Sequence, residues 1–231
     1  MFKIKICGIK DLATAANCVQ SGASAIGLNF YEKSKRCVSV ETAGEIAAAV
    51  EGNIAVVGLF VNHTLDQICE VANAVGLDYL QFHGDESASI LHGLDSRPEL
   101  EHVSVIRAIR LGRENSVQAL SEIDRWTSAN GSSRLASFIL DTFQPGQFGG
   151  TGLAIDWGWL SKIKLPTNVP VILAGGLEPQ NVAEAIETVR PFGVDVAGGV
   201  ENLKHQKDPA LIKAFVQNAN LAFGKITDEC S

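Results

Sequence analysis

The sequence is short of positive charge and of long apolar runs. It has 19 lysines and arginines against 26 aspartates and glutamates, which gives a formal net charge of −7. A net-acidic chain is a poor general binder of nucleic acid or of an anionic membrane surface. The apolar run from Ile54 to Val61 is far too short to span a membrane, and the N-terminus alternates lysine with apolar residues instead of forming a signal-peptide core. We therefore expect a cytoplasmic protein that binds neither nucleic acid nor membranes.

Paired cysteines, clustered histidines and a dinucleotide fingerprint are missing as well. The five cysteines are Cys7, Cys18, Cys37, Cys69 and Cys230. Their odd number and wide spacing, without a C-x-x-C pair, predict the reduced thiols of a cytosolic protein. No histidines have metal-ligand spacing, and no G-x-G-x-x-G follows the first predicted strand. The sequence therefore predicts no metal site and no dinucleotide cofactor.

Apolar residues are plentiful, at 46% of 231 residues, and they fall in eight short runs separated by amphipathic segments. The runs are rich in Val, Ile and Leu and have the length of buried strands. They cover residues 4–7, 25–30, 54–61, 79–83, 103–109, 137–141, 169–174 and 193–197. Eight units of about 29 residues each are typical of a single (β/α)8 TIM barrel near its lower size limit. An open doubly wound sheet is the alternative, without its usual dinucleotide motif.

Capping residues mark several helices and the end of the domain. Four predicted helical segments cover residues 11–16, 64–74, 178–189 and 208 to about 221. Gly224 is a plausible end for the last helix, so we expect a barrel over residues 1–224 and a C-terminal tail over 225–231. Residues 124–133 are expected to form a polar loop.

Two glycine pairs follow the seventh and eighth predicted strands, where a parallel barrel places its chemistry. They are Gly175-Gly176 and Gly198-Gly199. A strand that ends in Gly-Gly and leads into a helix exposes backbone N–H groups that suit an anion. One such pair is explained by a tight turn alone, but two pairs after consecutive strands favour a phosphate site.

An aspartate and a cysteine also stand at strand ends. Asp141 follows an apolar strand, and desolvation at the barrel mouth favours its protonated carboxyl, as a general acid requires. The alternative role for Asp141 is a helix N-cap. Cys7 ends the first strand, and its thiol is a base at neutral pH only if a cation such as Lys5 stabilises the thiolate. The alternative role for Cys7 is that of a small hydrophobic residue.

Two further polar side chains are expected at the mouth. Gln81 and His83 share strand parity, so both should point into the barrel, and His83 suits either a hydrogen-bonding scaffold or a proton carrier. Arg36 lies in the basic segment 31–36 after the second strand. Its guanidinium can bind a carboxylate, although a solvated basic loop explains it equally well.

Taken together, these residues form motifs that resemble those of the phosphoribosylanthranilate isomerase family. The motifs are Lys5-Ile6-Cys7-Gly8, Gln81-Phe82-His83-Gly84-Asp85-Glu86, Leu140-Asp141-Thr142, Gly149-Gly150-Thr151-Gly152, Ala174-Gly175-Gly176-Leu177 and Gly193-Val194-Asp195-Val196. They stand in the family's order and run from the first strand to the last. The resemblance covers essentially the whole chain.

The resemblance implies a cofactor-free TIM barrel at the third committed stage of tryptophan biosynthesis. Its reaction is the Amadori rearrangement of N-(5-phosphoribosyl)anthranilate to the 1-deoxyribulose 5-phosphate derivative. By resemblance, Asp141 is the general acid, Cys7 the general base, and Arg36 the residue that binds the anthranilate carboxylate. The remaining implied substrate-binding residues are His83, Gly150, Gly175, Gly176, Asp195, Gly198 and Gly199. The segment with Gly150 is expected to close over the phosphate.

The sequence departs from the family pattern in three places. Residues 31–37 lack the usual prolines after Tyr31 and before Arg36, which should loosen the loop that orients the arginine. The eighth strand ends in Ala197-Gly198-Gly199 where the family usually has two serines before the glycine, so hydroxyl donors to the phosphate are lost. The third departure is an insertion-like stretch at 124–134, remote from the expected site.

Two other functions are compatible with this sequence. One is the related aldose–ketose isomerase of histidine biosynthesis, but that barrel should carry a second phosphate site, and no Gly-Gly turn follows the third or fourth strand. The other is a catalytically silent phosphate-binding barrel, which retention of both Cys7 and Asp141 argues against. The expected partner is a small phosphorylated substrate. We expect a monomer, with a homodimer as the alternative, because no exposed apolar stripe is evident.

Overall fold

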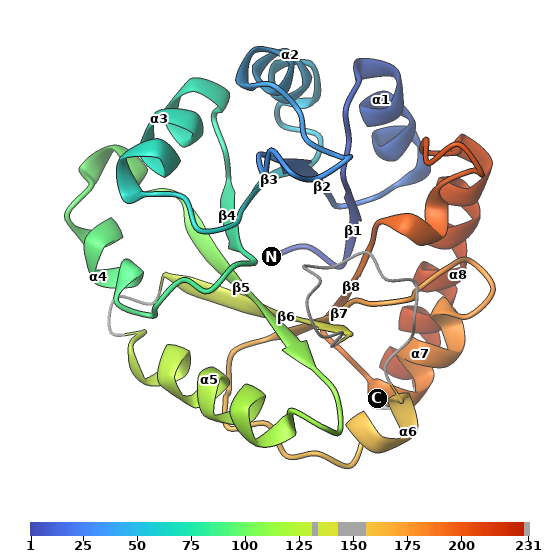
Figure 1. Cartoon of the computed structure of the whole chain (residues 1–231). Helices are drawn as coiled ribbons and strands as arrows, with labels where there is room; N and C mark the ends of the chain where they lie inside the picture. Colours follow the sequence, from blue (N-terminus) through green and yellow to red (C-terminus); the bar gives the residue numbers. More distant parts are fainter. Residues whose placement is uncertain (131–133, 143–155, 229–231) are drawn as a thin grey trace.

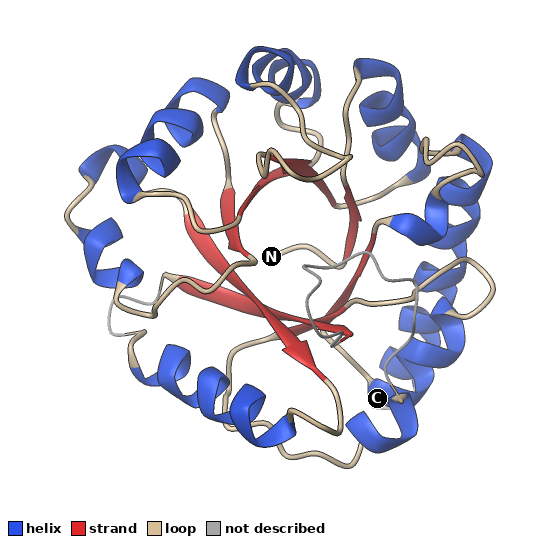
Figure 2. Ribbon diagram, in the orientation of Figure 1, coloured by secondary structure: helices blue, strands red, loops and turns tan. Residues whose placement is uncertain are grey.

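The chain forms a closed barrel of eight parallel strands surrounded by helices (Figures 1 and 2). The computed structural model describes residues 1–130, 134–142 and 156–228. The strands are β1 (Ile4–Cys7), β2 (Ala25–Asn29), β3 (Ala55–Phe60), β4 (Tyr79–Phe82), β5 (Ser104–Leu111), β6 (Leu135–Thr142), β7 (Val171–Leu173) and β8 (Gly193–Val196). β1 pairs with β2 on one side and with β8 on the other, which closes the barrel. The predicted fold is therefore confirmed.

A ring of helices covers the outside of the sheet (Figure 2). The helices are α1 (Leu12–Ser21), α2 (Val40–Val50), α3 (Leu65–Val75), α4 (Ile90–Asp95), α5 (Ser116–Ser128), α6 (Trp157–Leu160), α7 (Val182–Val189) and α8 (Pro209–Asp228). Short 3₁₀ turns occur at η1 (Pro98–Leu100) and η2 (Gly198–Val200). Two of the helix starts predicted from sequence, at residues 11 and 64, are capped: Asp11 accepts from the Thr14 N–H, and Thr64 forms a capping box with Gln67.

Three predicted helix boundaries are wrong, and the predicted loop 124–133 is wrong over residues 124–128, while residues 131–133 lie outside the described residues. α1 continues past residue 16 to Ser21, and Gly22 ends it in a left-handed conformation (φ +82°). α7 begins at Val182, because residues 178–181 form a turn in which the Asn181 side chain bonds the Glu178 N–H and the Gly176 carbonyl. α8 runs through Gly224 to Asp228, so the helix ends neither near residue 221 nor at Gly224. Residues 124–128 are the last turn of α5, because Trp126 is buried there against the core.

Apolar side chains fill the barrel from inside and from outside. The larger cluster lies between the sheet and the helices and is built from the outward-facing strand residues, such as Ile26 and Leu140. The inner cluster comes from the alternate strand positions and includes Phe2, which meets Tyr79 edge-on at 5.4 Å between ring centroids. Phe2 precedes β1 and Tyr79 begins β4, so this contact lies at the N-terminal end of the barrel. The opposite end, where the strands end, is left for polar side chains.

Candidate active site

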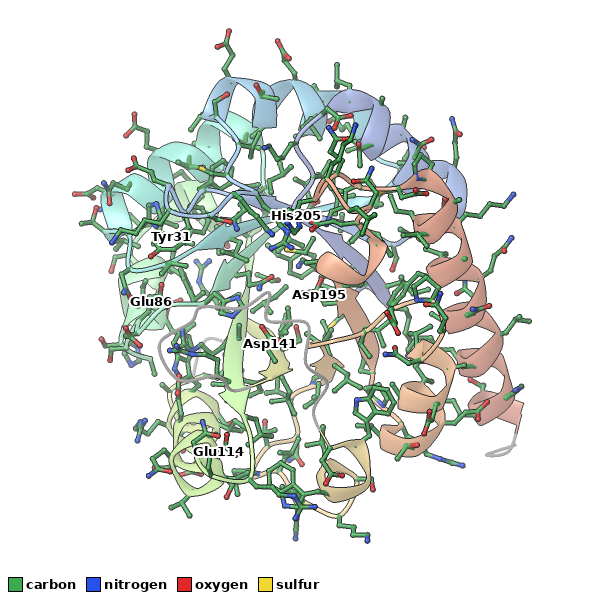
Figure 3. The ribbon with its side chains drawn as sticks, turned by 45° about the vertical axis from the view of Figure 1, so that its right-hand side comes forward. Tyr31, Glu86, Glu114, Asp141, Asp195 and His205 are labelled. Atoms are coloured by element: carbon green, nitrogen blue, oxygen red, sulfur yellow. The ribbon has the colours of Figure 1, made fainter. Side chains whose placement is uncertain are left out.

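A cavity of about 300 Å³ occupies the mouth of the barrel at the C-terminal ends of the strands. It is lined by the following residues predicted from the sequence: Cys7, Arg36, His83, Asp141, Gly175, Gly176, Asp195, Gly198 and Gly199. Asp141 and Asp195 lie toward the centre of the molecule in Figure 3, whereas Glu114 lies at the periphery. Gly150 lies outside the described residues. Every other predicted site residue is therefore brought into one cavity.

Cys7 stands beside a buried lysine that is itself paired. Lys5 is fully buried inside the barrel, and its Nζ lies 2.9 Å from the Asp195 carboxylate. A Cβ placed on Gly27 would lie 2.9 Å from Cys7 Sγ and 3.1 Å from Lys5 Cε, so both side chains lie against this one glycine. Burial tends to lower the pKa of Lys5, but the neighbouring Asp195 and Cys7 groups outweigh it and raise that pKa. Lys5 is thus a protonated cation next to the cysteine sulfur, as the sequence suggested.

The other buried thiols lie in different surroundings. In α1, burial raises the pKa of Cys18 to about 12, and the positive charge of Lys207 is too weak an influence to offset it. Cys69 is buried on α3, where burial also raises the pKa of its thiol. Of the described cysteines, only Cys7 lines the cavity, whereas Cys18 and Cys69 are packed in the hydrophobic core.

Asp141 and His83 are neighbours in the lining of the cavity. The carboxylate Oδ2 lies 3.6 Å from His83 Nε2, and both side chains are about 90% buried. Burial, followed by the charges of Arg107, Arg110 and Lys5, lowers the pKa of His83 to about 3, so its imidazole is neutral. Gln81 Nε2 lies 3.5 Å from His83 Nδ1. When the Gln81 amide donates to Nδ1, the imidazole proton is on Nε2 and points toward the carboxyl group.

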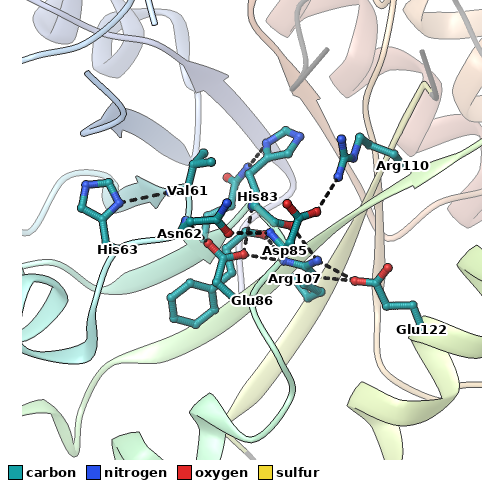
Figure 4. Close-up of polar contacts among 12 residues, drawn as sticks. Val61, Asn62, His63, His83, Asp85, Glu86, Arg107, Arg110 and Glu122 are labelled. Atoms are coloured by element: carbon teal, nitrogen blue, oxygen red, sulfur yellow. Dashed lines mark hydrogen bonds and ion pairs between the residues drawn. The ribbon is translucent and has the colours of Figure 1, made fainter. Parts of the chain in front are cut away.

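His83 is held by an arginine network behind the strand (Figure 4). Arg107, 3% exposed on β5, donates to the Phe82 and Gly84 carbonyls on either side of His83. It also pairs with Glu86 at 2.7 Å and with Glu122 at 2.5 Å. Removing this cation would leave two carboxylates without their partner, so Arg107 fixes the β4 end that presents His83.

Arg36 is engaged in the barrel mouth and is not part of a solvated loop. Its Nε and Nη2 donate to the two carboxylate oxygens of Glu201, at 2.6 and 2.9 Å. Its stem packs on Gly8, where a Cβ would collide with it. The loop before it is tied by side chains: the Ser34 hydroxyl accepts from the Asn29 amide and from the Arg36 N–H, each at 3.1 Å. These two bonds restrain the loop that carries Arg36.

The two glycine turns lie against each other. Gly175 and Gly176 have φ values of +84° and +65°, which L side chains rarely adopt. A Cβ on Gly199 would overlap the carbonyl oxygen of Leu177, so no larger residue fits between the turns. Both turns therefore require glycine for conformation or space, and both line the cavity.

Two residues of the mouth were not predicted from the sequence: Glu201, which bonds Arg36, and Lys207, which bonds Glu201. Lys207 Nζ lies 2.9 Å from Glu201 Oε1 and 2.8 Å from the Ala197 carbonyl. Two hydrogen bonds from Arg36 and one from Lys207 outweigh the burial of Glu201 and hold its pKa at about 2. In the sequence, a glutamate two residues after Gly199 was the available sign that position 201 belongs to the site. Its partner could not be predicted, because Arg36 is 165 residues away in the chain.

The described residues contain no group of three or more His, Cys, Asp or Glu side chains placed to bind a metal ion. Across the same residues, no helix combines the length and the apolar character that crossing a membrane requires.

The fold and the cavity define the class of protein: a (β/α)8 barrel enzyme with a thiol, a carboxyl group and two glycine turns at one mouth. Residues 4–218 match the family model described as N-(5'phosphoribosyl)anthranilate (PRA) isomerase. The chain therefore belongs to the PRA isomerase family.

Individual relatives agree over nearly the whole chain. An N-(5'-phosphoribosyl)anthranilate isomerase of Pseudomonas fluorescens (strain Pf0-1) is 45% identical over 212 residues, which cover 92% of this chain and 95% of the relative. The structure of phosphoribosyl anthranilate isomerase from Thermotoga maritima superposes with a TM-score of 0.79 at 35% identity, covering 95% of this chain and 99% of that one. A further structure of the isomerase, with a TM-score of 0.74 and 34% identity, covers the same shares and contains reduced 1-(o-carboxyphenylamino)-1-deoxyribulose 5-phosphate.

Proposed function

We propose that this cavity catalyses the Amadori rearrangement of N-(5-phosphoribosyl)anthranilate, a step of tryptophan biosynthesis, with Asp141 as general acid and Cys7 as general base. One observation carries the proposal: the thiol, the carboxyl group and both glycine turns line the same cavity in a chain of the PRA isomerase family. An acid and a base are the two groups that an aldose-to-ketose rearrangement requires.

The first step opens the ribose ring. Asp141 gives its proton to the ring oxygen, the bond from that oxygen to C1 breaks, and the anthranilate nitrogen lone pair forms the C1=N bond of a Schiff base. The neutral imidazole of His83 supports this role, because it adds no positive charge that would favour the ionised carboxylate.

The second step moves a proton from carbon. The Cys7 thiolate takes the C2 proton, the C–H electrons form the C1=C2 bond, and the electrons of C1=N return to nitrogen. The enolamine then tautomerises to the ketone. The protonated Lys5 beside Cys7 stabilises the thiolate, and Asp195 keeps Lys5 in place.

Three further regions of the cavity each bind one part of the substrate. The backbone N–H groups of the Gly175-Gly176 and Gly198-Gly199 turns bind the phosphate. Apolar side chains of Leu59 and Val61, with Tyr31 packed on them, provide a surface for the anthranilate ring. Arg36 binds the anthranilate carboxylate.

The same proposal covers cofactor, location and assembly. Both steps move protons and leave the oxidation balance of the substrate unchanged, so the reaction needs no redox cofactor. We place the enzyme in the cytoplasm and expect a monomer, with a homodimer as the alternative. A second structure from Thermotoga maritima is of monomers generated from that organism's dimeric isomerase. Analytical ultracentrifugation of this chain will distinguish a monomer from a homodimer.

The test is a steady-state assay that follows the loss of substrate fluorescence with freshly prepared phosphoribosylanthranilate. Cys7→Ala and Asp141→Asn should each lower kcat at least about 100-fold with little change in KM. Cys69→Ala and Asp124→Asn make the same chemical changes outside the cavity and should keep the wild-type rate. A Cys7→Ala enzyme at the wild-type rate would rule out the assigned base, and undiminished turnover by Asp141→Asn would rule out the acid.

A further inference from the structure

Among the described residues, Arg36 bonds the protein through only one of the two hydrogen-bonding edges of its guanidinium. This group has a side edge, made of Nε and Nη2, and an end edge, made of Nη1 and the second Nη2 hydrogen. Glu201 takes the side edge in a two-point contact, at 2.6 and 2.9 Å. This contact fixes the plane of the guanidinium and leaves its end edge for a second carboxylate.

Glu201 is too buried to be an ordinary surface partner. Its side chain is 4% exposed, and those of Lys207 and Arg36 are 5% and 14% exposed. One anion shared by two cations leaves the cluster with a net charge of +1 at the cavity wall. A buried carboxylate contributes here by holding donors in one geometry, since the cost of desolvation offsets most of its attraction.

The cluster also connects Arg36 to the glycine turn of β8. Lys207 bonds both Glu201 and the carbonyl of Ala197, the residue directly before Gly198-Gly199. A backbone bridge between Glu201 and Lys207 closes the intervening loop, with Asn202 N–H donating to the Gln206 carbonyl at 2.8 Å. Glu201 therefore sits on a short, closed loop whose base is the glycine turn itself.

We propose that Glu201 is a positioning residue that aims the end edge of Arg36 at the substrate carboxylate, and that Lys207 sets the distance of this edge from the phosphate turn. The inference rests on the proposed function, since it takes Arg36 as the carboxylate-binding residue. It follows that Glu201 decides selectivity between a ligand that carries both an aryl carboxylate and a phosphate and one that carries the phosphate alone.

The experiment compares Glu201→Gln and Glu201→Asp with the wild type on two substrates. One is phosphoribosylanthranilate and the other is its analogue with aniline in place of anthranilate, which lacks the carboxylate. Glutamine has one accepting oxygen, and its NH2 group would face donors of Arg36 or Lys207, so Arg36 loses its fixed plane. We expect Glu201→Gln to raise KM for phosphoribosylanthranilate about 10-fold or more, and to change KM for the aniline analogue less than about 2-fold.

Glu201→Asp keeps the charge but is one methylene shorter, so it cannot reach both partners fully and should lower the preference for the carboxylate about 3-fold. It also keeps the proposal testable if the glutamine variant fails to fold, which thermal unfolding by circular dichroism checks. Glu45→Gln, the same change on an exposed position of α2, is the matched control and should leave both KM values unchanged. Equal losses on both substrates, or no loss on either, would overturn the proposal.

A binding measurement separates this proposal from the proposed reaction. Calorimetry with the reduced product analogue, with and without its carboxylate, gives the carboxylate preference without turnover. A wild-type preference that disappears in Glu201→Gln supports the positioning role even if the protein does not isomerise phosphoribosylanthranilate. A wild-type protein that binds both analogues equally overturns it.

Discussion

The burial of the His83 imidazole predicts how the free energy of unfolding depends on pH. Burial and nearby cations lower its pKa in the folded protein from 6.5 to about 3. Between these values the unfolded chain binds a proton that the folded chain does not, so stability must fall as the pH is lowered through this window. A full proton of difference contributes about 1.4 kcal/mol per pH unit, and at pH 6.5 the unfolded histidine is only half protonated, so going from pH 6.5 to 4.5 should cost the folded state about 2 kcal/mol through this residue.

Substituting the histidine isolates this contribution. His83→Gln has no side chain at this position that titrates in the window, so its free energy of unfolding should fall about 2 kcal/mol less than that of the wild type between pH 6.5 and 4.5. Urea unfolding followed by circular dichroism at several pH values measures both slopes. His92→Gln, at an exposed position of α4, is the matched control and should keep the wild-type slope. Equal slopes for the wild type and His83→Gln would refute the assignment of a neutral, buried imidazole.

Three further substitutions test how the barrel holds its site. Gly199→Ala should destabilise the protein by about 1–3 kcal/mol and weaken phosphate binding, because the new methyl group overlaps the Leu177 carbonyl. Thermal unfolding measures the loss. The control is Gly44→Ala on α2, where a Cβ makes only an ordinary contact, and this change should be neutral or stabilising. Arg107→Met should lower the free energy of unfolding by about 3–5 kcal/mol, because it leaves the buried Glu86 side chain without its cation. A loss below about 1 kcal/mol, measured by urea unfolding, would contradict this prediction. Thr64→Ala should cost about 1 kcal/mol through loss of the α3 cap, with no effect on KM.

Much of the fold was predictable from local patterns. All eight strands lie at the predicted apolar runs, and β1 has the predicted ends, because a parallel strand buried on both faces needs a continuous apolar segment. Helix ends were harder to predict. Gly224 does not stop α8, and burial of Trp126 extends α5, since contacts with the sheet outweigh local helix preferences.

The sequence by itself determined which chemical groups reach the mouth of the barrel. A parallel barrel brings the C-terminal ends of all its strands to one side, so Cys7, His83 and Asp141 share a cavity as soon as the strands are correctly placed. Parity along β4 likewise determines that Gln81 and His83 both point inward.

Only the tertiary structure decided the partners of these groups. Lys5 pairs with Asp195, 190 residues away, because β1 and β8 meet where the barrel closes. Arg36 pairs with Glu201, 165 residues away, because the segment after β2 and the segment after β8 come into contact at the same mouth. Local patterns specify helices, strands and their ends, but the charge that a buried side chain faces depends on which distant loops meet, and that is settled only when the sheet closes.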